Sequence, residues 1–545
     1  MSANKLNSTD YQSLASSHKK NGANNGDISS LKPIQKSRQS IIEEQEADSL
    51  LSLVNPYQEI KKKEPAAELE PSVNQPLETV ISKVNKSEKT ETVALSFAEE
   101  QKQRKLQKTI EKDKKLLNSD RWIVRNGHTL TYVGLFLFTL TVYFRPYEWV
   151  PGFESFTSLA FIFALATLLV YLPTQLATEG SLTILTTEVK CLLFLGFWSL
   201  LTMPIAKDPG LAWTVFNETF SKIIIIFIVA VNTLRSQSRL KGLMWLSIGM
   251  GTLLSYQSIE LYRQGKFEVE GYRVNVDYGG MFGNPNDMAL HLVMFLPVAV
   301  VLGLTSKNIL VKLVYFVSAG LMVGANMVTQ SRGGFLGLVA VSAFLVWKLS
   351  KKARLKVILI SLVVAAGIIA VAPGDYGKRI ISIFDVRQDV SGSHDQRREL
   401  LERSIQVTLR NPIGIGLGNF PIVGVRNLQT HNAFTQVSSE LGWLALVVYV
   451  IFLVSPFRKL AAIERQMFAR DDTSWIYYLS IGLQTCIIGY MVSSFFVSVA
   501  YQWFIYFPIA YAVCLRRIYN TQQEEKGEKG ITENSLTDYF KTQKA

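Results

Sequence analysis

Long apolar runs follow one another from residue 128 to residue 516, and polar segments separate them. Each run is about 17 to 20 residues long, the length that a helix needs to cross a hydrocarbon layer of about 30 Å. The pattern predicts twelve spans, at residues 128–145, 156–173, 188–205, 216–234, 242–261, 287–304, 309–328, 334–349, 356–373, 435–455, 475–495 and 500–516. We therefore expect an all-α polytopic membrane protein.

The polar ends of the chain complete the predicted organisation. Residues 1–126 are rich in Ser, Asn, Gln, Lys and Glu and offer too little apolar surface for a core, so we predict a largely disordered, charged tail. Residues 127–518 form the predicted transmembrane domain, and residues 519–545 form a second tail. Residues 96–117 carry Glu and Lys at helical spacing, and two interpretations are open: a helix on anionic lipid or a solvated spacer.

Basic residues predict the orientation of the spans. The chain has a formal net charge of +13, and its short basic loops are residues 235–241, 348–356, 457–470 and 515–518. All four loops fall on one side if both termini are cytoplasmic, as the positive-inside rule requires. The one long loop of the domain, residues 374–432, then faces the periplasm or the exterior. The basic excess thus reflects topology, and no nucleic-acid-binding motif accompanies it.

Polar side chains are costly inside a bilayer, and here they gather at the predicted outer face. The stretch "MFGNPNDMALHLVMF" (281–295) places Asn286 and Asp287 at the start of the sixth span, where either residue is a candidate helix cap. His291 lies four residues after Asp287 and is its candidate hydrogen-bond partner. The stretch "TQSRGGFLGLVAV" (329–341) places Arg332 between two spans, as a functional cation or an interfacial anchor.

Residues 397–410 of the long loop show the pattern of an amphipathic helix that would lie along the outer membrane surface. The face predicted to meet the membrane domain contains Arg397, Leu401, Ile405 and Leu409, with Leu400 near its edge. Arg398 lies on the neighbouring polar face, where it can pair with Glu402. The following "NPIGIGLGNF" (411–420) is not a nucleotide-binding loop, because no strand precedes it and no helix start follows it.

A His-Asn pair begins the stretch "THNAFTQVSSELGWLALVVYVIFLV" at the outer end of the tenth span, in a chain with five histidines. His431 is either a general base for a hydroxyl or an interfacial histidine that caps the helix. Arginines match the planar geometry of phosphate oxygens. Neither the paired acids of a glycoside hydrolase nor the ligand cluster of a metal centre is visible. This set suits a hydroxyl that attacks a carbon bearing a diphosphate leaving group.

Four stretches, in this order and topology, resemble the O-antigen ligase and O-antigen polymerase superfamily over about residues 130–517. They are "GNPNDMA", "TQSRGG", "RRELL…NPIGIGLGNF" and "THNAF…SSELGWLA". Ligases of this family carry His-Asn, nine residues, then Gly-x-x-Gly. Here His431 and Asn432 are followed by nine residues and Gly442, and Ala445 replaces the last glycine. The family's Arg-x-x-x-Leu element matches the residues that start at Arg397.

The resemblance implies an inverting, metal-independent glycosyltransferase without a cofactor, of the lipid-sugar-dependent membrane type, in the cytoplasmic (inner) membrane of a bacterium. Its donor would be a polyprenyl-diphosphate-linked glycan, such as one on undecaprenyl diphosphate. Its acceptor would be a hydroxyl of a glycan, lipid A core or protein, in lipopolysaccharide or exopolysaccharide biosynthesis. The implied diphosphate-binding pair is Arg332 and Arg397, and the implied base is His431. Secondary candidates are Arg398, Asn432, Asn286, Asp287 and Glu440, the last expected to be a polar contact in helix packing.

Ligase and polymerase remain alternatives, because these motifs do not identify the acceptor. Two other classes are open. A solute transporter of the same superfamily, for example for bicarbonate, would place polar residues and broken helices near the bilayer midplane. A non-catalytic scaffold, whose tail docks polysaccharide-assembly proteins, would not need Arg332, Arg397 and His431 together.

Overall fold

The computed structural model describes residues 126–149, 156–267, 282–371 and 393–542, together with a few isolated positions between them and in residues 104–107. These residues belong to one compact unit, Gln103–Ala545. Apart from those positions, the predicted N-terminal tail and the predicted helix at 96–117 lie outside the described residues.

The described part of the chain is helical, as predicted, and its one β-bridge joins Val269 to Arg273. A first helical span, Asn126–Glu148, overlaps α3 (Pro146–Trp149). The following elements are α4 (Leu159–Glu179), α5 (Thr187–Thr202), η2 (Met203–Ile205), α6 (Pro209–Val215), η3 (Phe216–Phe220), α7 (Ser221–Thr233), α8 (Gln237–Arg263), α9 (Pro285–Thr305), α10 (Ile309–Val328), α11 (Arg332–Val371), α13 (Ser393–Arg410), α14 (Phe420–Val423), η5 (Val425–Asn427), α15 (Ala433–Ala469), α16 (Trp475–Ser493), η6 (Ser494–Phe496) and α17 (Tyr506–Thr542).

Within the residues that the structure describes, nine helices are long and apolar enough to cross a membrane. They coincide with nine of the twelve predicted spans. The other three predictions, at 242–261, 356–373 and 500–516, overlap α8, the second half of α11 and the start of α17, and none of these three segments is among the nine. The total of twelve therefore stays a prediction.

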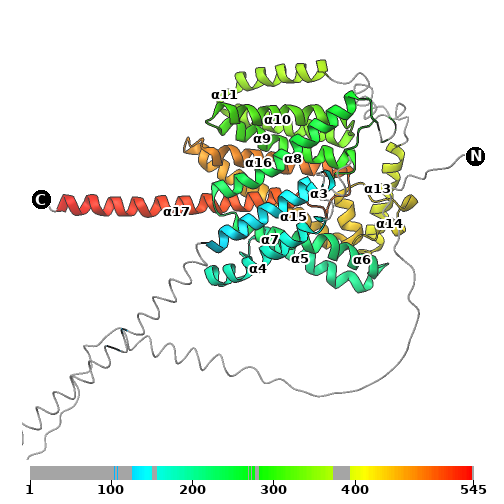
Figure 1. The fold of residues 1–545 in the computed structure, drawn as a ribbon, viewed down its shortest axis with the longest axis horizontal. Coiled ribbons are helices and arrows are strands. Elements are labelled where there is room, and N and C mark those ends of the chain that lie inside the picture. The colour runs from blue at the N-terminus through cyan, green and yellow to red at the C-terminus, as the bar shows by residue number, and fades with distance from the viewer. Residues whose placement is uncertain are drawn as a thin grey trace, which may run out of the picture. The chain divides into compact units, whose positions relative to one another are not determined.

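The long helices run side by side, whereas α6, α13 and α14 lie together at one end of them (Figure 1). α13 runs across the helix ends, and α17 projects from the opposite end. The helix predicted at 397–410 is confirmed as α13, which starts four residues earlier, at Ser393.

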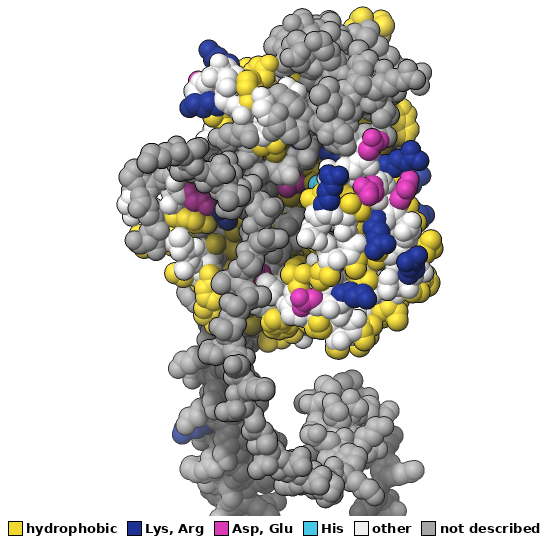
Figure 2. Space-filling model, turned by 90° about the vertical axis from the view of Figure 1, so that its right-hand side faces the viewer, with side chains coloured by type: hydrophobic (Ala, Val, Ile, Leu, Met, Phe, Trp, Pro, Cys, Tyr) yellow, Lys and Arg dark blue, Asp and Glu magenta, His cyan; other side chains and the backbone are white. Residues whose placement is uncertain are grey.

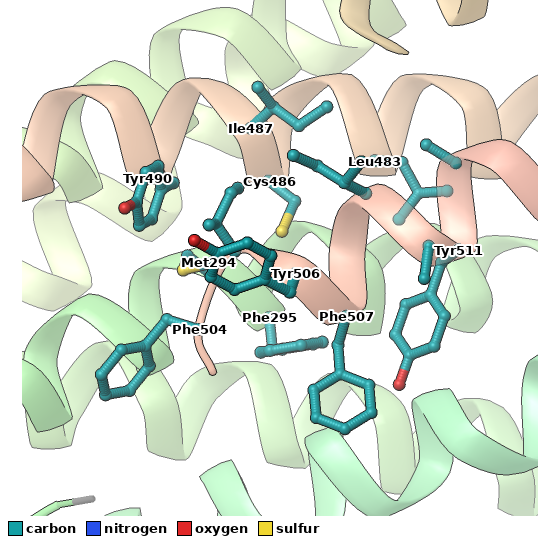
Figure 3. Packing of buried hydrophobic residues seen from close by; sticks show 14 of the residues in the cluster. Met294, Phe295, Leu483, Cys486, Ile487, Tyr490, Phe504, Tyr506, Phe507 and Tyr511 are labelled. Atoms are coloured by element: carbon teal, nitrogen blue, oxygen red, sulfur yellow. The ribbon is translucent and has the colours of Figure 1, made fainter. Parts of the chain in front are cut away.

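The centre of the bundle is built from α9, α16 and the first turns of α17. Of the most apolar window in α9, 83% is buried inside the protein, against 22% for α4. Phe295, Cys486 and Tyr506 bring these three helices together, as Figure 3 shows. α9 is therefore covered by protein, whereas α4 leaves most of its apolar surface for lipid.

Carboxylates of α4, α5 and α15 form ion pairs with residues from all four predicted basic loops. The pairs are Glu179 with Arg235 and Arg517, Glu188 with Lys459 and Arg516, and Glu464 with Lys348 and Lys351. Adjacent residues Arg516 and Arg517 connect the pairs of Glu188 and Glu179, and α15 carries both Lys459 and Glu464, so the ion pairs lie together. The four loops therefore lie at the same end of the bundle, and their cytoplasmic location remains a prediction.

α15 is interrupted at Gly442, which has φ 84° and ψ 172°. The span predicted at 435–455 is confirmed as an apolar helix, and it contains this break. A break exposes backbone carbonyls, which need partners within a bilayer. The loop before α15 supplies them: Ile415 N–H donates to Ser439 O (3.1 Å), and Gly416 N–H donates to Glu440 O (2.9 Å).

Two further hydrogen bonds satisfy backbone groups at the break. Trp198 Nε1 of α5 donates to Leu441 O (2.8 Å), and Trp443 N–H donates to Pro412 O (3.2 Å). The two backbones touch at glycines: a Cβ on Gly442 would lie 2.2 Å from Pro412 O. The loop 411–420 therefore packs directly into the interrupted helix, and only glycine permits this approach.

Gly442→Ala should destabilise the protein. This backbone conformation is essentially restricted to glycine and costs another residue about 1–3 kcal/mol, to which the overlap with Pro412 O adds. We expect the midpoint of thermal unfolding in detergent, measured by fluorescence-detected size exclusion, to fall by several degrees. Gly320→Ala is the control, because Gly320 lies in α10 and an added Cβ there would meet nothing within 4 Å. Equal midpoints for Gly442→Ala and the wild type would contradict the tight contact.

Candidate functional site

Asn432 closes the N-terminus of α15. Its Oδ1 accepts hydrogen bonds from the N–H groups of Phe434 (2.8 Å) and Thr435 (3.1 Å). The alternative that His431 caps this helix is therefore wrong. His431 has φ 50°, which is uncommon for a residue other than glycine. Thr430 Oγ1 donates to Asn432 O (2.8 Å), so the turn that presents His431 is held on both sides of the histidine.

Arg397 of α13 lies near His431. Burial and the positive charge of Arg397 lower the pKa of His431 to about 4. Within the described part of the chain, the ring of His431 makes no hydrogen bond, whereas Thr408 of α13 does bond to Ser438 of α15 (3.0 Å). The imidazole is therefore neutral near pH 7, and a lone pair on its ring can accept a proton.

The face of α13 that packs on the protein is not the predicted one. Ile405 is 46% exposed and Leu409 is 76% exposed. The buried face contains Leu400, Ser404 and Val407. The reason is the loop 411–420, which folds back and covers this face, so α13 packs on its own continuation. Arg397 lies three residues before Leu400, on the side of the covered face.

Arg398 forms the expected ion pair with Glu402, with 3.0 Å between Nε and Oε1, on the exposed side of α13. An exposed pair of this kind contributes little to stability.

Arg332 begins α11, next to the start of α9. Asn286 joins the two helices, because its Oδ1 accepts hydrogen bonds from Ser331 Oγ (2.9 Å) and from Arg273 Nη2 (2.8 Å). Arg273 also donates from Nε to Thr329 O (3.0 Å). Asn286 and Arg273 therefore fix the turn that immediately precedes Arg332.

Asn286 and Asp287 do not cap α9, because Asn284 does so by accepting the N–H of Asn286 (2.8 Å). His291 is not paired with Asp287 either: its Nε2 donates to Ser247 O (3.2 Å) in an aromatic surrounding. Asp287 Oδ1 is buried and has no hydrogen-bond partner among the described residues. In the same residues, no three His, Cys, Asp or Glu side chains are grouped so that they could hold a metal ion.

The segment 493–500 lies between Arg332 and His431. Ser493 Oγ donates to the carbonyl of Gly333 (3.3 Å), the residue after Arg332. Ser498 Oγ hydrogen-bonds with Thr430 Oγ1 (3.0 Å), next to His431. The structure thus brings Arg397 close to His431 and places Arg332 beside the same short segment.

The part of the chain that carries these residues has a recognisable family. Residues 317–450 match the family model described as O-antigen ligase. This stretch, about a quarter of the chain, is therefore similar to the O-antigen ligase family. The comparison with curated proteins gave no match. The O-antigen ligase region contains Arg332, Arg397, His431 and the break at Gly442, whereas Arg273 and Asn286 precede it.

An apolar groove of about 570 Å³ lies at the edge of the O-antigen ligase region. Its lining consists of Leu336, Phe434, Met491, Val492, Phe495 and Phe496. Leu336 is one helical turn after Arg332, and Phe434 is three residues after His431. Two of the lining residues thus lie within about one helical turn of Arg332 and His431 in sequence, and the groove suits an apolar ligand.

Figure 2 shows the end of the molecule where α13 and α14 lie. Lys and Arg side chains are spread over the described part of this face, with some Asp and Glu among them, and a histidine is visible next to a basic side chain. The basic groups on this face favour the approach of anionic ligands.

Sequence reasoning missed Arg273 and the segment 493–500. A lone arginine in a polar loop gives no sequence signal for a contact with α9. The two serines of the segment, Ser493 and Ser498, look like ordinary polar residues at a helix end. The glycines at 414, 416 and 418, all with positive φ, were the available signal for the packing of the loop.

His431 should titrate with a pKa of about 4 in ¹H–¹³C NMR spectra of histidine-labelled protein in nanodiscs. Arg397→Gln should raise this pKa towards the ordinary value of about 6.5, because it removes a positive charge that opposes protonation. His431→Gln assigns the resonance.

Arg398→Gln is the control, because it removes an exposed arginine from the adjacent position and should leave the pKa of His431 unchanged. An Arg397→Gln variant with the wild-type pKa would show that the two side chains are not neighbours.

Proposed function

We propose that this protein transfers a glycan from a polyprenyl-diphosphate carrier to a hydroxyl acceptor, as an O-antigen ligase or polymerase at the outer face of the cytoplasmic membrane. The observation that carries the proposal is a neutral His431 beside Arg397, within the region that matches the O-antigen ligase family. A neutral histidine is a base, and an arginine recognises the leaving group.

Arg332 and Arg397 bind the diphosphate of the donor. A guanidinium group offers two parallel N–H donors to phosphate oxygens and remains charged at any physiological pH. The bonds from Arg273 and Ser331 to Asn286 fix the backbone that carries Arg332. This support restricts where the Arg332 side chain can reach.

The apolar groove holds part of the prenyl chain. Its six apolar side chains match a hydrocarbon ligand, and burial of apolar surface contributes about 25 cal/mol for each Å². Because Leu336 follows Arg332 by one turn, a chain in the groove places its diphosphate end near the arginine.

The reaction is a substitution at the anomeric carbon. His431 accepts the proton of the acceptor hydroxyl while its oxygen forms the new C–O bond. The bond between the anomeric carbon and the diphosphate oxygen breaks, and that oxygen keeps the electron pair. Attack opposite the leaving group inverts the configuration, and the arginines stabilise the charge of the departing diphosphate.

Donor binding also strengthens the base. Arg397 lowers the pKa of His431 in the protein without donor. A diphosphate that pairs with Arg397 offsets this charge, so the pKa of His431 rises when the donor is present. The histidine is thus a better proton acceptor in the complex in which it is needed.

His431→Ala should reduce transfer by about 100-fold or more, the usual contribution of a positioned general base. The Arg332→Ala/Arg397→Ala double variant should abolish it, because the diphosphate loses both partners. The measurement is the surface-glycan gel profile and the lipid-linked oligosaccharide pool in a deletion strain complemented at matched expression. Arg398→Ala is the control and should restore the wild-type profile.

The accumulating species separates the two reactions. Single lipid-linked repeats indicate a polymerase, and complete lipid-linked chains indicate a ligase. Wild-type glycan in His431→Ala and in the double variant would overturn the proposal and direct the next assay to solute uptake.

Val492→Trp should narrow the groove and raise the KM for a long-chain polyprenyl-diphosphate donor several-fold. A donor analogue with a methyl group in place of the prenyl chain should be unaffected, because it has no chain to place in the groove. Val447→Trp is the control, since Val447 lies on an exposed, apolar part of α15. Equal losses with both donors would show that the groove does not hold the prenyl chain.

A further inference from the structure

Glu440 has no exposed surface, yet its carboxylate forms no ion pair with a described cation. Both of its oxygens accept hydrogen bonds from the loop 411–420, and the side chain of Tyr501 lies beside the carboxylate. Oε2 accepts a hydrogen bond from Gly418 N–H (2.9 Å), and Oε1 accepts one from Phe420 N–H (3.4 Å). Burial of a carboxylate is costly unless such bonds compensate for the lost water. The hydrogen bonds from the backbone of this loop therefore compensate the Glu440 carboxylate for its burial.

The residues that Glu440 holds also support α13. Phe420 and Ile415 form a buried apolar cluster with Leu400 and Val407 of α13. Arg403 of α13 donates from Nε to the carbonyl of Val423, just after the loop (2.9 Å). A shift of Phe420 would thus move the surface on which α13 rests.

The other side of the loop is fixed by the segment between α5 and α6. Asn419 accepts the N–H of Asp208 (2.6 Å) and donates to its carbonyl (3.2 Å), and Lys207 N–H donates to Ile415 O (2.8 Å). The loop is therefore held between α5–α6 and α15. The Glu440 side chain is a contact on the α15 side that a substitution can remove without changing a glycine.

We propose that Glu440 is a positioning residue for Arg397. Its carboxylate sets the loop 411–420, the loop sets α13, and α13 holds Arg397 next to His431. Glu440 itself does not touch the substrate. The positioning of Arg397 by Glu440 does not depend on which reaction the protein catalyses. The role of Arg397 in binding a diphosphate rests on the proposed function.

The test uses the NMR titration of His431 in full-length protein in nanodiscs. Glu440→Ala removes both acceptors, so Arg397 should move away and the pKa of His431 should rise towards its value in Arg397→Gln. Glu440→Gln retains one acceptor oxygen and should give a smaller rise in the same direction. Transfer should fall by about 100-fold in Glu440→Ala, as expected when a binding group is displaced by about 1 Å.

Glu464→Gln is the matched control. Glu464 is equally buried on the same helix, but it pairs with Lys348 and Lys351 at the other end of the bundle. This variant should lose stability without changing the pKa of His431. In the Arg397→Gln background, Glu440→Ala should cause no further rise, because the charge that it displaces is already absent.

A wild-type pKa of His431 in folded Glu440→Ala and Glu440→Gln would overturn the positioning role. If Glu440→Ala does not fold, Glu440→Gln and Phe420→Leu decide the question, since Phe420→Leu loosens the same support and should also raise the pKa. The titration needs no donor, so the two proposals fail separately. A raised pKa of His431 in Glu440→Ala, together with a wild-type glycan profile in both His431→Ala and the double arginine variant, would keep the positioning role and overturn the proposed function.

Discussion

A helix that is interrupted in a membrane protein must find new partners for the carbonyls that it exposes, and this requirement organises one end of the bundle. Gly442 breaks α15, and the loop 411–420 donates its N–H groups to the exposed carbonyls. The same loop covers one face of α13, which carries Arg397 to His431. The broken helix and the candidate site are therefore parts of one arrangement: the backbone that completes α15 is also the support on which the position of Arg397 depends.

The opposite end of the bundle is held together by buried ion pairs. There, Glu188 and Glu464 are buried, and lysines and arginines from loops that are distant in sequence surround them. An intact buried ion pair contributes little net stability, but the loss of one partner destabilises the protein strongly, because it leaves a buried charge unpaired. These contacts therefore specify how the helix ends meet. The two ends thus use buried carboxylates in contrasting ways. Glu464 joins charged loops, whereas Glu440 binds neutral backbone at the end where the proposed chemistry takes place.

Much of this arrangement could be predicted from local patterns. Apolar run length gave the helical fold, and helical periodicity gave α13 to within four residues of its start. The interior face of α13 could not be predicted, because Leu400 and Val407 are buried by a loop whose path no periodicity encodes. In the sequence, Gly442 looks like a small residue that allows close helix packing. Only its contact with the loop that contains Gly414 shows that the helix is interrupted there. Arg273 and the groove depend on contacts between separate segments, which a single sequence does not reveal.

The order of the chain has a consequence for how the interrupted helix forms. The residues that fill the break lie about 25 positions before it, so they are made before α15 and close a short loop, which costs little conformational entropy. Trp198 is the exception, because it lies 243 residues from the Leu441 carbonyl that it binds. Most hydrogen bonds of the break are therefore local in sequence, whereas the bond from Trp198 requires α5 to pack against α15. Assembly of the bundle and completion of α15 are coupled through this one indole.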